Sequence, residues 1–502
     1  MYYPQLNEIK EIAKNKEYKR IPISYEIYSD SNTPIEVMRR LKKISKHCYM
    51  VERIEDTEKW GRYTFLGFNP LLEFTCQNGE VKITGDYIHT NLKNAETLTT
   101  KTNNPKKYIQ KIIKENKTPR LKKLPPFTGG LVGYFAYDYI KYNEPSLNLD
   151  AENQDGFNDI DLMLFDKVIV FDNFKQKIYI IVNMLTDNIE ENYKKAKKDI
   201  KKIIQIIKTG TPAEIEPLNL KSEFKPSFTQ KEYCKIVEKA KHYIHEGDIF
   251  QIVPSNRIEA DLTGSLFDTY RVLRTTNPSP YMFYFSSEDI EIAGASPETL
   301  VKVQDNKVFT FPLAGTRPRG KTEKEDKELE QDLLNDEKEL AEHNMLVDLG
   351  RNDIGKISEI GSVKVDKYLN IEKFSHVMHI GSTVEGTLRK DLDPIVAIDS
   401  ILPAGTLSGA PKIRACEIIN ELEKNKRGIY GGAIGYIDLS GNLDTCIAIR
   451  IAFARNNKVF IRSGGGVVAD SIPDAEYQET LNKAAAVIKA LETANGGIEW
   501  YF

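Results

Sequence analysis

The chain has 502 residues, 40% hydrophobic and 28% charged, and its 70 Lys and Arg against 73 Asp and Glu give a formal net charge of -3. This composition is typical of a globular protein with room for two domains, and the slightly acidic balance argues against a nucleic-acid-binding protein. Five scattered cysteines without a CxxC pair indicate neither a zinc site nor a disulfide framework, and without an apolar leader or membrane span we expect a cytoplasmic protein with no membrane partner.

The first part of the chain reads as one helix followed by short strands. Residues 1–20 predict a polar amphipathic helix at the periphery. From residue 21 to about residue 180, runs with the composition of strands are separated by Gly and Asn turns. The clearest of these runs are residues 62–66, 71–76 and 168–171. Residues 190–208 are rich in Lys and have a helical period.

A proline-containing segment divides the sequence. Residues 207–227 hold three prolines and show little periodicity, so we interpret them as a linker between a first domain, residues 1–206, and a second domain, residues 228–502. The second domain opens with a predicted helix over residues 228–246. A capping box predicts a further, long charged helix from Thr322 to about Leu349.

Two predicted helices carry acidic pairs at the spacing of one helical face. Glu339 and Glu342 are three residues apart on the first, and Glu476 and Glu479 repeat this spacing on the second, where Lys483 follows Glu479 by four. Carboxylates from two helices are suitable ligands for Mg²⁺, a hard cation that binds oxygen. Solvated helix faces with one i,i+4 ion pair explain the same spacing.

Residues 402–423 combine a turn rich in Gly and Pro with a helix whose apolar residues recur every three positions. Ser408 is the predicted N-cap, and Pro411 suits the first turn because no backbone donor is needed there. With the charge of Lys412, this helix start could bind a small anion such as a carboxylate. A capped helix without a ligand is the alternative.

Three further features could carry chemistry. Arg450 lies in a run of alternating apolar residues whose small neighbours leave room for a bidentate grip on a carboxylate. The glycines 464–466 interrupt a strand-like segment and allow close backbone approach to a ligand. His379 could act as an acid or base near neutral pH. The structural alternatives are an interface ion pair, a β-bulge and a buried core histidine.

Taken together, these stretches resemble the chorismate-utilising enzymes, most closely their anthranilate synthase component I branch. The motifs that carry the resemblance are, in chain order, PLAGTRPRG, EKELAEHNMLVDLGRND, SHVMH, PAGTLSGAPKIRA, RGIYGGAIGY, DTCIAIR and GGGVVADS before an EYQET helix. They cover residues 228–492 densely, and YMVERIE and WGRYTFLG extend the match into the first half.

The resemblance implies an α/β (α+β) fold: a two-layer sandwich of orthogonally packed, mainly antiparallel β-sheets flanked by helices. It also implies that residues 1–206 form a regulatory domain of the tryptophan-sensing type packed on a catalytic domain, residues 228–502. The implied reaction starts with attack of ammonia on C2 of chorismate and loss of the 4-hydroxyl. Elimination of pyruvate then gives anthranilate.

The resemblance further implies the roles of individual residues. Glu342 and Glu479 match the ligands of an Mg²⁺ ion, the expected cofactor. Glu298 matches the acid that helps hydroxide leave, and His379 matches the histidine of the lyase half-reaction. The residues that match substrate contacts are Gly315, Thr316, Thr406, Tyr430, Arg450, Gly464, Gly465, Gly466 and Lys483.

Two positions bear on sister activities. Ala314 stands where aminodeoxychorismate synthases often carry a nucleophilic lysine, and Gln251 stands where isochorismate synthases carry a lysine that activates water. Both favour anthranilate formation, while an aminodeoxychorismate synthase and a non-catalytic chorismate- or tryptophan-binding homologue remain the alternatives. Since no glutaminase triad is visible, we expect a glutamine amidotransferase partner subunit to supply ammonia.

The tryptophan feedback site of the family is only partly matched. Pro278, Ser279 and Pro280 match one loop of that site, but Arg53 stands where the other segment usually has a small serine. A long cation there could fill the site or repel the amino group of tryptophan, so we expect weakened or altered inhibition. Pro254 and the pair Arg462-Ser463 also depart from the family pattern, which has Leu and Gln-Ala.

Overall fold

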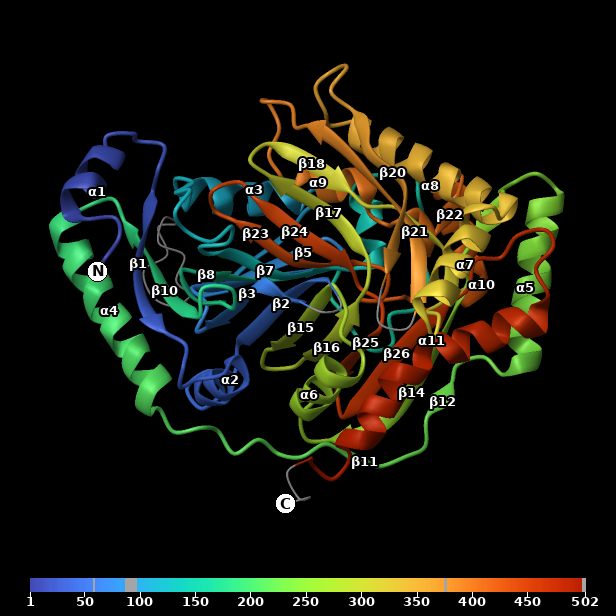
Figure 1. Cartoon of the computed structure of the whole chain (residues 1–502), viewed down its shortest axis with the longest axis horizontal. Coiled ribbons are helices and arrows are strands. Elements are labelled where there is room, and N and C mark those ends of the chain that lie inside the picture. The colour runs from blue at the N-terminus through green and yellow to red at the C-terminus, as the bar shows by residue number, and fades with distance from the viewer. Residues whose placement is uncertain (57–58, 86–96, 374–376, 499–502) are drawn as a thin grey trace.

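The computed structural model describes residues 1–56, 59–85, 97–373 and 377–498, and it is built around two large antiparallel sheets (Figure 1). Within the described residues, each sheet has twelve strands. The first sheet contains, in spatial order, β1 (Arg20–Tyr28), β10 (Lys177–Leu185), β9 (Lys167–Asp172), β3 (Lys59–Phe68), β2 (Cys48–Asp56), β15 (Tyr281–Ser286), β16 (Glu291–Ser296), β25 (Ile451–Arg455), β26 (Lys458–Gly464), β14 (Ser255–Thr263) and β11 (Asn219–Leu220), with β12 (Lys225–Pro226) also paired to β14.

The second sheet follows the same antiparallel pattern. Its strands are, in spatial order, β19 (Leu313–Pro318), β21 (Val377–Thr387), β18 (Lys307–Thr310), β17 (Thr299–Gln304), β24 (Leu443–Ile447), β23 (Ala433–Asp438), β7 (Gly130–Phe135), β8 (Ile160–Phe165), β4 (Leu72–Gln77), β5 (Glu80–Gly85) and β6 (Leu98–Lys101), with β20 (Lys364–Lys373) also paired to β21. A separate small sheet pairs β13 (Gln251–Ile252) with β22 (Gly409–Ala410).

Each sheet contains one block of strands from residues 1–206 and one block from the later part of the chain, and the two blocks join at a single strand pairing. In the first sheet β2 pairs with β15, and in the second β7 pairs with β23. The segment 207–227 contributes β11 and β12 to one edge of the first sheet. Residues 1–206 and 228–502 therefore share both sheets, and the division into a regulatory and a catalytic domain stays a prediction.

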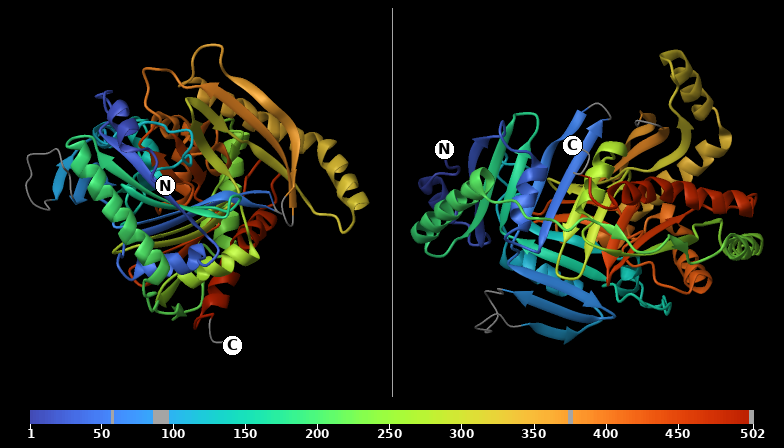
Figure 2. Two further views of the ribbon diagram at one scale, coloured as in Figure 1. Left: turned by 60° about the vertical axis from the view of Figure 1, so that its left-hand side comes forward. Right: turned by 90° about the horizontal axis from the view of Figure 1, so that it is seen from below.

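The two sheets pack face to face around an aromatic core, and Figure 2 shows their strands running across one another. Tyr49, Phe65 and Phe283 of the first sheet meet Tyr134 and Tyr436 of the second. Such side chains bury large apolar areas, so this layer contributes much of the hydrophobic stabilisation of the fold. The predicted sandwich of antiparallel sheets is confirmed.

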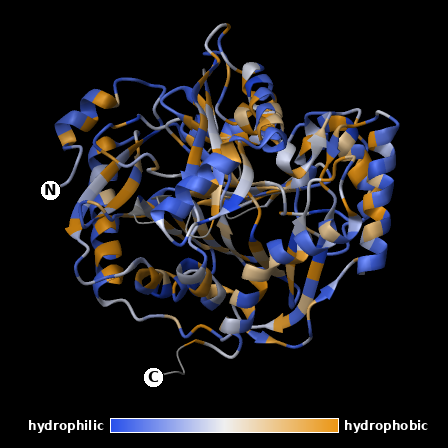
Figure 3. Ribbon diagram, turned by 45° about the vertical axis from the view of Figure 1, so that its right-hand side comes forward, coloured by the Kyte–Doolittle hydropathy of each residue, from blue (hydrophilic) through white to orange (hydrophobic). Residues whose placement is uncertain are grey.

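Helices cover the outer faces of the sandwich. On the first sheet they are α2 (Pro34–Lys42), α4 (Ile189–Thr209), α6 (Phe267–Thr276) and α11 (Pro473–Ala494), and on the second α3 (Lys106–Glu115), α8 (Glu337–Gly355) and α9 (Val396–Ile401). The remaining helices are α1 (Leu6–Ile12), α5 (Gln230–His245), α7 (Glu323–Leu334) and α10 (Lys412–Glu423). Figure 3 shows that apolar and polar residues alternate along these helices, as expected when one face packs on a sheet. Within the described residues, no helix is long and apolar enough to cross a membrane.

Two helix predictions were wrong in extent. The helix predicted over residues 1–20 is limited to α1, and β1 begins at Arg20. The long charged helix is two helices, because the Asp336 carboxylate accepts hydrogen bonds from the backbone N–H groups of Lys338 and Glu339 and so starts a new helix. The predicted helices over residues 190–208 and 228–246 and the three named strands are confirmed.

Candidate functional site

The acidic residues of α8 and α11 lie on either side of the glycine turn at residues 464–466. Gln251 Nε2 is 3.5 Å from Glu342 Oε1, and a Cβ atom added to Gly466 would lie 2.8 Å from the same amide nitrogen. A Cβ added to Gly465 would lie 3.6 Å from the Glu479 carboxylate. The ends of the Gln251 and Glu479 side chains thus lie close to this turn, which brings residues of the two helices to one site.

This end of α11 also has the features expected of a cation site. Glu476 Oε2 is buried without a hydrogen-bond partner, and it would lie 2.6 Å from a Cβ on Gly465. Burial raises the pKa of Glu476, and the charge of Glu479 raises it further. In the described part of the chain, no group of three or more His, Cys, Asp or Glu side chains has the arrangement of a metal site. The described acidic side chains therefore do not by themselves form a closed metal site.

Arg450 does not lie in a regular strand, contrary to the sequence prediction. β24 ends at Ile447 and β25 starts at Ile451, and Arg450 between them has a left-handed φ of 54°. This conformation, unusual for a residue with a Cβ, lets its Nη1 donate to the Lys483 carbonyl at 2.7 Å. Burial lowers the pKa of Arg450, and the Glu479 charge partly opposes that effect.

Lys483 joins the glycine turn to α11. Its Nζ donates to the Gly464 carbonyl at 2.9 Å and forms an ion pair with Glu479 Oε1 at 2.6 Å. The i,i+4 ion pair expected from the helical spacing is therefore present. Lys483 and Arg450 place two cations beside the acidic residues, an arrangement that can hold an anion and a cation together.

Glu298 and Thr406 come from different segments and meet at the site. The Thr406 hydroxyl donates to Glu298 Oε1 at 3.1 Å, and the two residues line a small cavity of about 50 Å³. Burial raises the pKa of Glu298 to about 7, although the Thr406 hydrogen bond and the Lys483 charge act in the opposite direction. At neutral pH a large fraction of this carboxyl is protonated, so it can donate a proton.

His379 is oriented by the turn in β19. Its Nδ1 is 2.6 Å from the Gly315 carbonyl oxygen and 3.2 Å from the Thr316 hydroxyl. Since a carbonyl only accepts, Nδ1 carries the proton and Nε2 is the basic nitrogen. Burial lowers the pKa of His379, and the Arg450 charge lowers it further although the Gly315 hydrogen bond acts in the opposite direction, so the neutral imidazole is favoured.

The predicted anion site at the start of α10 is wrong in its details. Pro411 occupies the N-cap position, and the Ser408 hydroxyl donates instead to the Ala404 carbonyl at 2.8 Å. Lys412 Nζ is 2.9 Å from Asp353 Oδ2 and 2.8 Å from the Ile401 carbonyl. Its charge is thus compensated by a residue of α8, and Lys412 holds α10 against α8 rather than facing a ligand.

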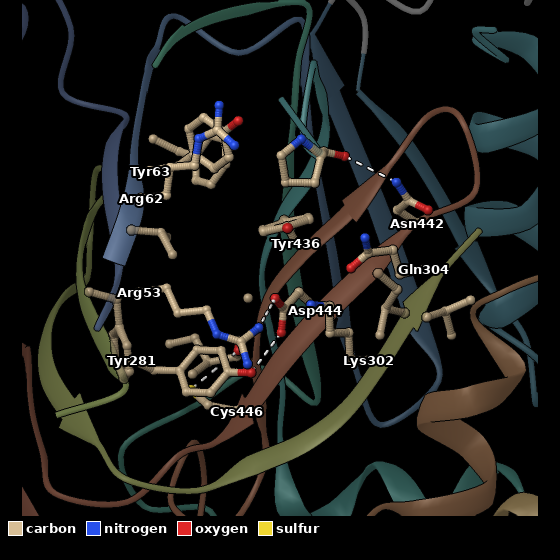
Figure 4. A pocket seen from close by; sticks show the side chains of 18 of the residues that line it. Arg53, Arg62, Tyr63, Tyr281, Lys302, Gln304, Tyr436, Asn442, Asp444 and Cys446 are labelled. Carbon is tan, nitrogen blue, oxygen red and sulfur yellow. Dashed lines mark hydrogen bonds and ion pairs between the residues drawn. The ribbon is translucent and has the colours of Figure 1, made fainter. Parts of the chain in front are cut away.

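One residue of the predicted feedback site, Arg53, lines a separate pocket, and the other three lie in the loop that leads to it. Arg53 of β2 is the register partner of Tyr281 of β15, so the loop with Pro278, Ser279 and Pro280 ends beside Arg53. Arg53 and Tyr281 line a pocket of about 460 Å³ between the sheets, which we call the inter-sheet pocket (Figure 4). Sequence reasoning missed Asp444 of β24, which accepts from Arg53 Nη1 at 2.9 Å and from the Tyr281 hydroxyl at 2.7 Å.

Comparisons with known proteins agree with this architecture. The family model described as chorismate binding enzyme matches residues 46–489. Anthranilate synthase component 1 of Acetivibrio thermocellus is 45% identical, covering 98% of this chain and 99% of that protein, and its Aquifex aeolicus counterpart is 42% identical, covering 97% and 98%. The crystal structure of anthranilate synthase component I from Streptococcus pneumoniae TIGR4 has a TM-score of 0.75 at 39% identity, covering 85% of this chain and 92% of that chain.

Proposed function

Because the chain belongs to the family of chorismate binding enzymes, we propose that it converts chorismate and ammonia to anthranilate and pyruvate as the large subunit of an anthranilate synthase, at the first step of tryptophan biosynthesis. The observation that carries this proposal is a pair of linked cations, each next to a group that can transfer a proton. The Lys483 charge acts on Glu298, a carboxyl with a raised pKa, and the Arg450 charge acts on His379, whose lowered pKa favours the neutral imidazole. The full-length similarity to component 1 proteins supports it.

The first half-reaction needs an acid and an anion-binding surface. Arg450 and Lys483 bind the carboxylates of chorismate, and Tyr430 and the glycine turn fix the ring. As ammonia attacks C2 to give 2-amino-2-deoxyisochorismate, protonated Glu298 gives its proton to the departing 4-hydroxyl, which leaves as water. Thr406 holds the carboxyl for this transfer, and the pKa of about 7 keeps a protonated fraction available.

The second half-reaction needs a base. The Nδ1–H bond to the Gly315 carbonyl presents Nε2 of His379 as a proton acceptor. His379 takes the C2 proton, the bond between C3 and the ether oxygen breaks, and the ring becomes aromatic. The leaving enolpyruvate takes up a proton to become pyruvate, so both atoms and charges balance.

Mg²⁺ is the cofactor that this donor set suits. Glu342 and Glu479 would hold it, and the unpartnered Glu476 Oε2 beside Gly465 supports a cation at this place. When bound, the ion supplies charge compensation for a substrate carboxylate. We expect dialysis against EDTA to abolish activity and Mg²⁺ to restore it, and calorimetry of Mg²⁺ binding to the Glu342→Gln variant to show at least tenfold weaker affinity.

Ammonia would come from a glutamine amidotransferase subunit, anthranilate synthase component II, in a heterotetramer in the cytoplasm. The component 1 names of the relatives support a second component. If a purified chain alone used glutamine as efficiently as ammonium salts, this part of the proposal would be wrong.

Tryptophan is the proposed feedback ligand of the inter-sheet pocket, with altered affinity because of Arg53. A physical link to the active site supports this regulation: the Tyr281 hydroxyl is 3.0 Å from the Thr299 hydroxyl, and Thr299 directly follows Glu298. An occupant that displaced Tyr281 would therefore act on β17, the strand that begins directly after the proposed acid.

One assay tests the proposed activity. The purified chain is mixed with chorismate, Mg²⁺ and an ammonium salt, and product is identified by fluorescence and mass. Anthranilate with an equal amount of pyruvate supports the proposal. Aminodeoxychorismate without pyruvate would indicate the sister activity, and binding of chorismate without turnover would indicate a non-catalytic homologue.

A further inference from the structure

A buried charged cluster lies behind the substrate-binding residues and takes no part in the mechanism above. Glu423, Arg427 and Arg462 are 1%, 3% and 2% exposed. Arg427 Nη2 donates to Glu423 Oε1 at 2.5 Å, and Arg462 Nη2 donates to Glu423 Oε2 at 2.8 Å. Two guanidinium groups share one carboxylate, so the cluster keeps one positive charge inside the protein.

The cluster ties together the segments that carry site residues. Arg427 donates to the carbonyl of Leu407, which follows Thr406, and to the carbonyl of Val253 in the segment after Gln251. Its guanidinium also lies 5.8 Å from the centre of the Tyr430 ring. Arg462 lies two residues before Gly464, where the glycine turn begins. Its Nε donates to the Ser255 hydroxyl at 2.8 Å.

The charge of the cluster reaches the site itself. Burial raises the pKa of Tyr430 to about 12, and the Glu423 charge acts in the same direction, while Arg427, Arg462 and Arg450 act to lower it. The surroundings are of low polarity, so charges there interact over longer distances than in water. An uncharged Gln at position 462 would leave Glu423 and Arg427 as a neutral pair.

We propose that Arg462 is a positioning residue whose excess positive charge, held in the Glu423–Arg427–Arg462 cluster, raises the affinity of the site for a ligand with two carboxylates. This inference rests on the proposed function, which supplies such a ligand in chorismate. Arg462 acts through the electrostatic field of its charge and by holding the segments to which it is hydrogen-bonded. It does not contact the reacting atoms.

The test compares two arginines that are register partners on neighbouring strands. Arg462 of β26 is opposite Arg257 of β14. Arg257, however, forms ion pairs with Asp155 at 2.5 Å and Glu259 at 2.9 Å, so its positive charge is compensated. We expect Arg462→Gln to raise the KM for chorismate about fivefold with kcat changed less than twofold. Arg257→Gln should change neither by more than twofold.

Two probes separate charge from packing. Isophthalate carries two carboxylates and benzoate one, and calorimetry measures the binding of each without turnover. Arg462→Gln should weaken isophthalate more than benzoate, and Arg462→Lys, which keeps the charge, should stay within twofold of the wild type for both. Equal losses for the two probes, or a Lys variant as weak as the Gln variant, would overturn the inference.

The outcomes for the two proposals are distinguishable. A wild-type chain that binds isophthalate but makes no anthranilate would contradict the proposed function alone. Unchanged isophthalate binding in Arg462→Gln would contradict the role of Arg462 alone. If the Gln variant fails to fold, as loss of a buried ion-pair partner can cause, the Lys variant still decides: binding within twofold supports the role of charge, and a larger loss contradicts it.

Discussion

The proposed active site and the inter-sheet pocket both contain a half-buried arginine, but the two arginines have different partners. Arg450 donates to the backbone carbonyl of Lys483, which is neutral, so its charge stays available to an anion. Arg53 forms a 2.9 Å ion pair with Asp444, which compensates its charge within the protein. An arginine can therefore provide positive charge for an anionic ligand in one site, whereas in another it pairs with a carboxylate and can obstruct a ligand.

The proposed active site and the inter-sheet pocket are also connected by one strand, β24. Asp444 lies near the start of β24, and at the end of that strand the Ile447 N–H donates to the carbonyl of Glu298 at 2.9 Å. A ligand that separates Arg53 from Asp444 would therefore disturb a strand that supports the proposed acid. Four experiments would sharpen or break this comparison.

The largest effect is expected from removing the acid. Glu298→Gln keeps the shape of the side chain but cannot donate its proton, so kcat should fall by about 10³-fold, within the range for loss of general acid catalysis. Anthranilate fluorescence with saturating ammonium measures it, and Thr406→Ser, which keeps a hydroxyl donor, serves as the control. A loss below tenfold would mean that Glu298 is not the acid.

The sequence could predict the helices that carry Glu342 and Glu479, because their spacing and motifs are local. It could not predict the left-handed backbone at Arg450, since alternating apolar residues favour a continuous strand. Nor could it predict that Asp353, 59 positions away, compensates Lys412, or that Asp444 pairs with Arg53, because such ion pairs are set by the packing of distant segments. The residue types of the site were thus predictable, and their partners were not.

A smaller effect, about 10²-fold on anthranilate formation, is expected for His379→Ala. The acid Glu298 remains in this variant, so chorismate should still be consumed and the amino intermediate should accumulate. Chromatography with mass detection follows both species, and added imidazole should restore part of the second step. Equal loss of chorismate consumption and anthranilate formation would contradict a role limited to the lyase step.

The inter-sheet pocket should respond to a single substitution. Arg53→Ser removes the cation that pairs with Asp444 and leaves that carboxylate able to bind the amino group of tryptophan. We expect the tryptophan concentration for half-inhibition to fall by about tenfold relative to the wild type. Lys302→Ser, at another cation of the pocket wall, is the control and should not increase the sensitivity. Strong inhibition of the wild type at micromolar tryptophan would show that Arg53 is accommodated.

The smallest effect concerns stability and follows from the burial that raises the pKa of Glu298. Its pKa is raised from 4.5 to about 7 in the folded chain, so the folded state binds the proton more tightly than the unfolded state. The stability from this group is complete below about pH 4.5 and is lost as the pH rises through 7. Because the side chain is partly exposed, we expect a loss of roughly 1–2 kcal/mol in the free energy of unfolding between pH 5 and pH 8, relative to Glu298→Gln. Urea unfolding of both proteins at the two pH values measures this difference. A difference that is independent of pH would mean that Glu298 titrates normally, and the active site would then lack the protonated carboxyl that distinguishes it from the pocket.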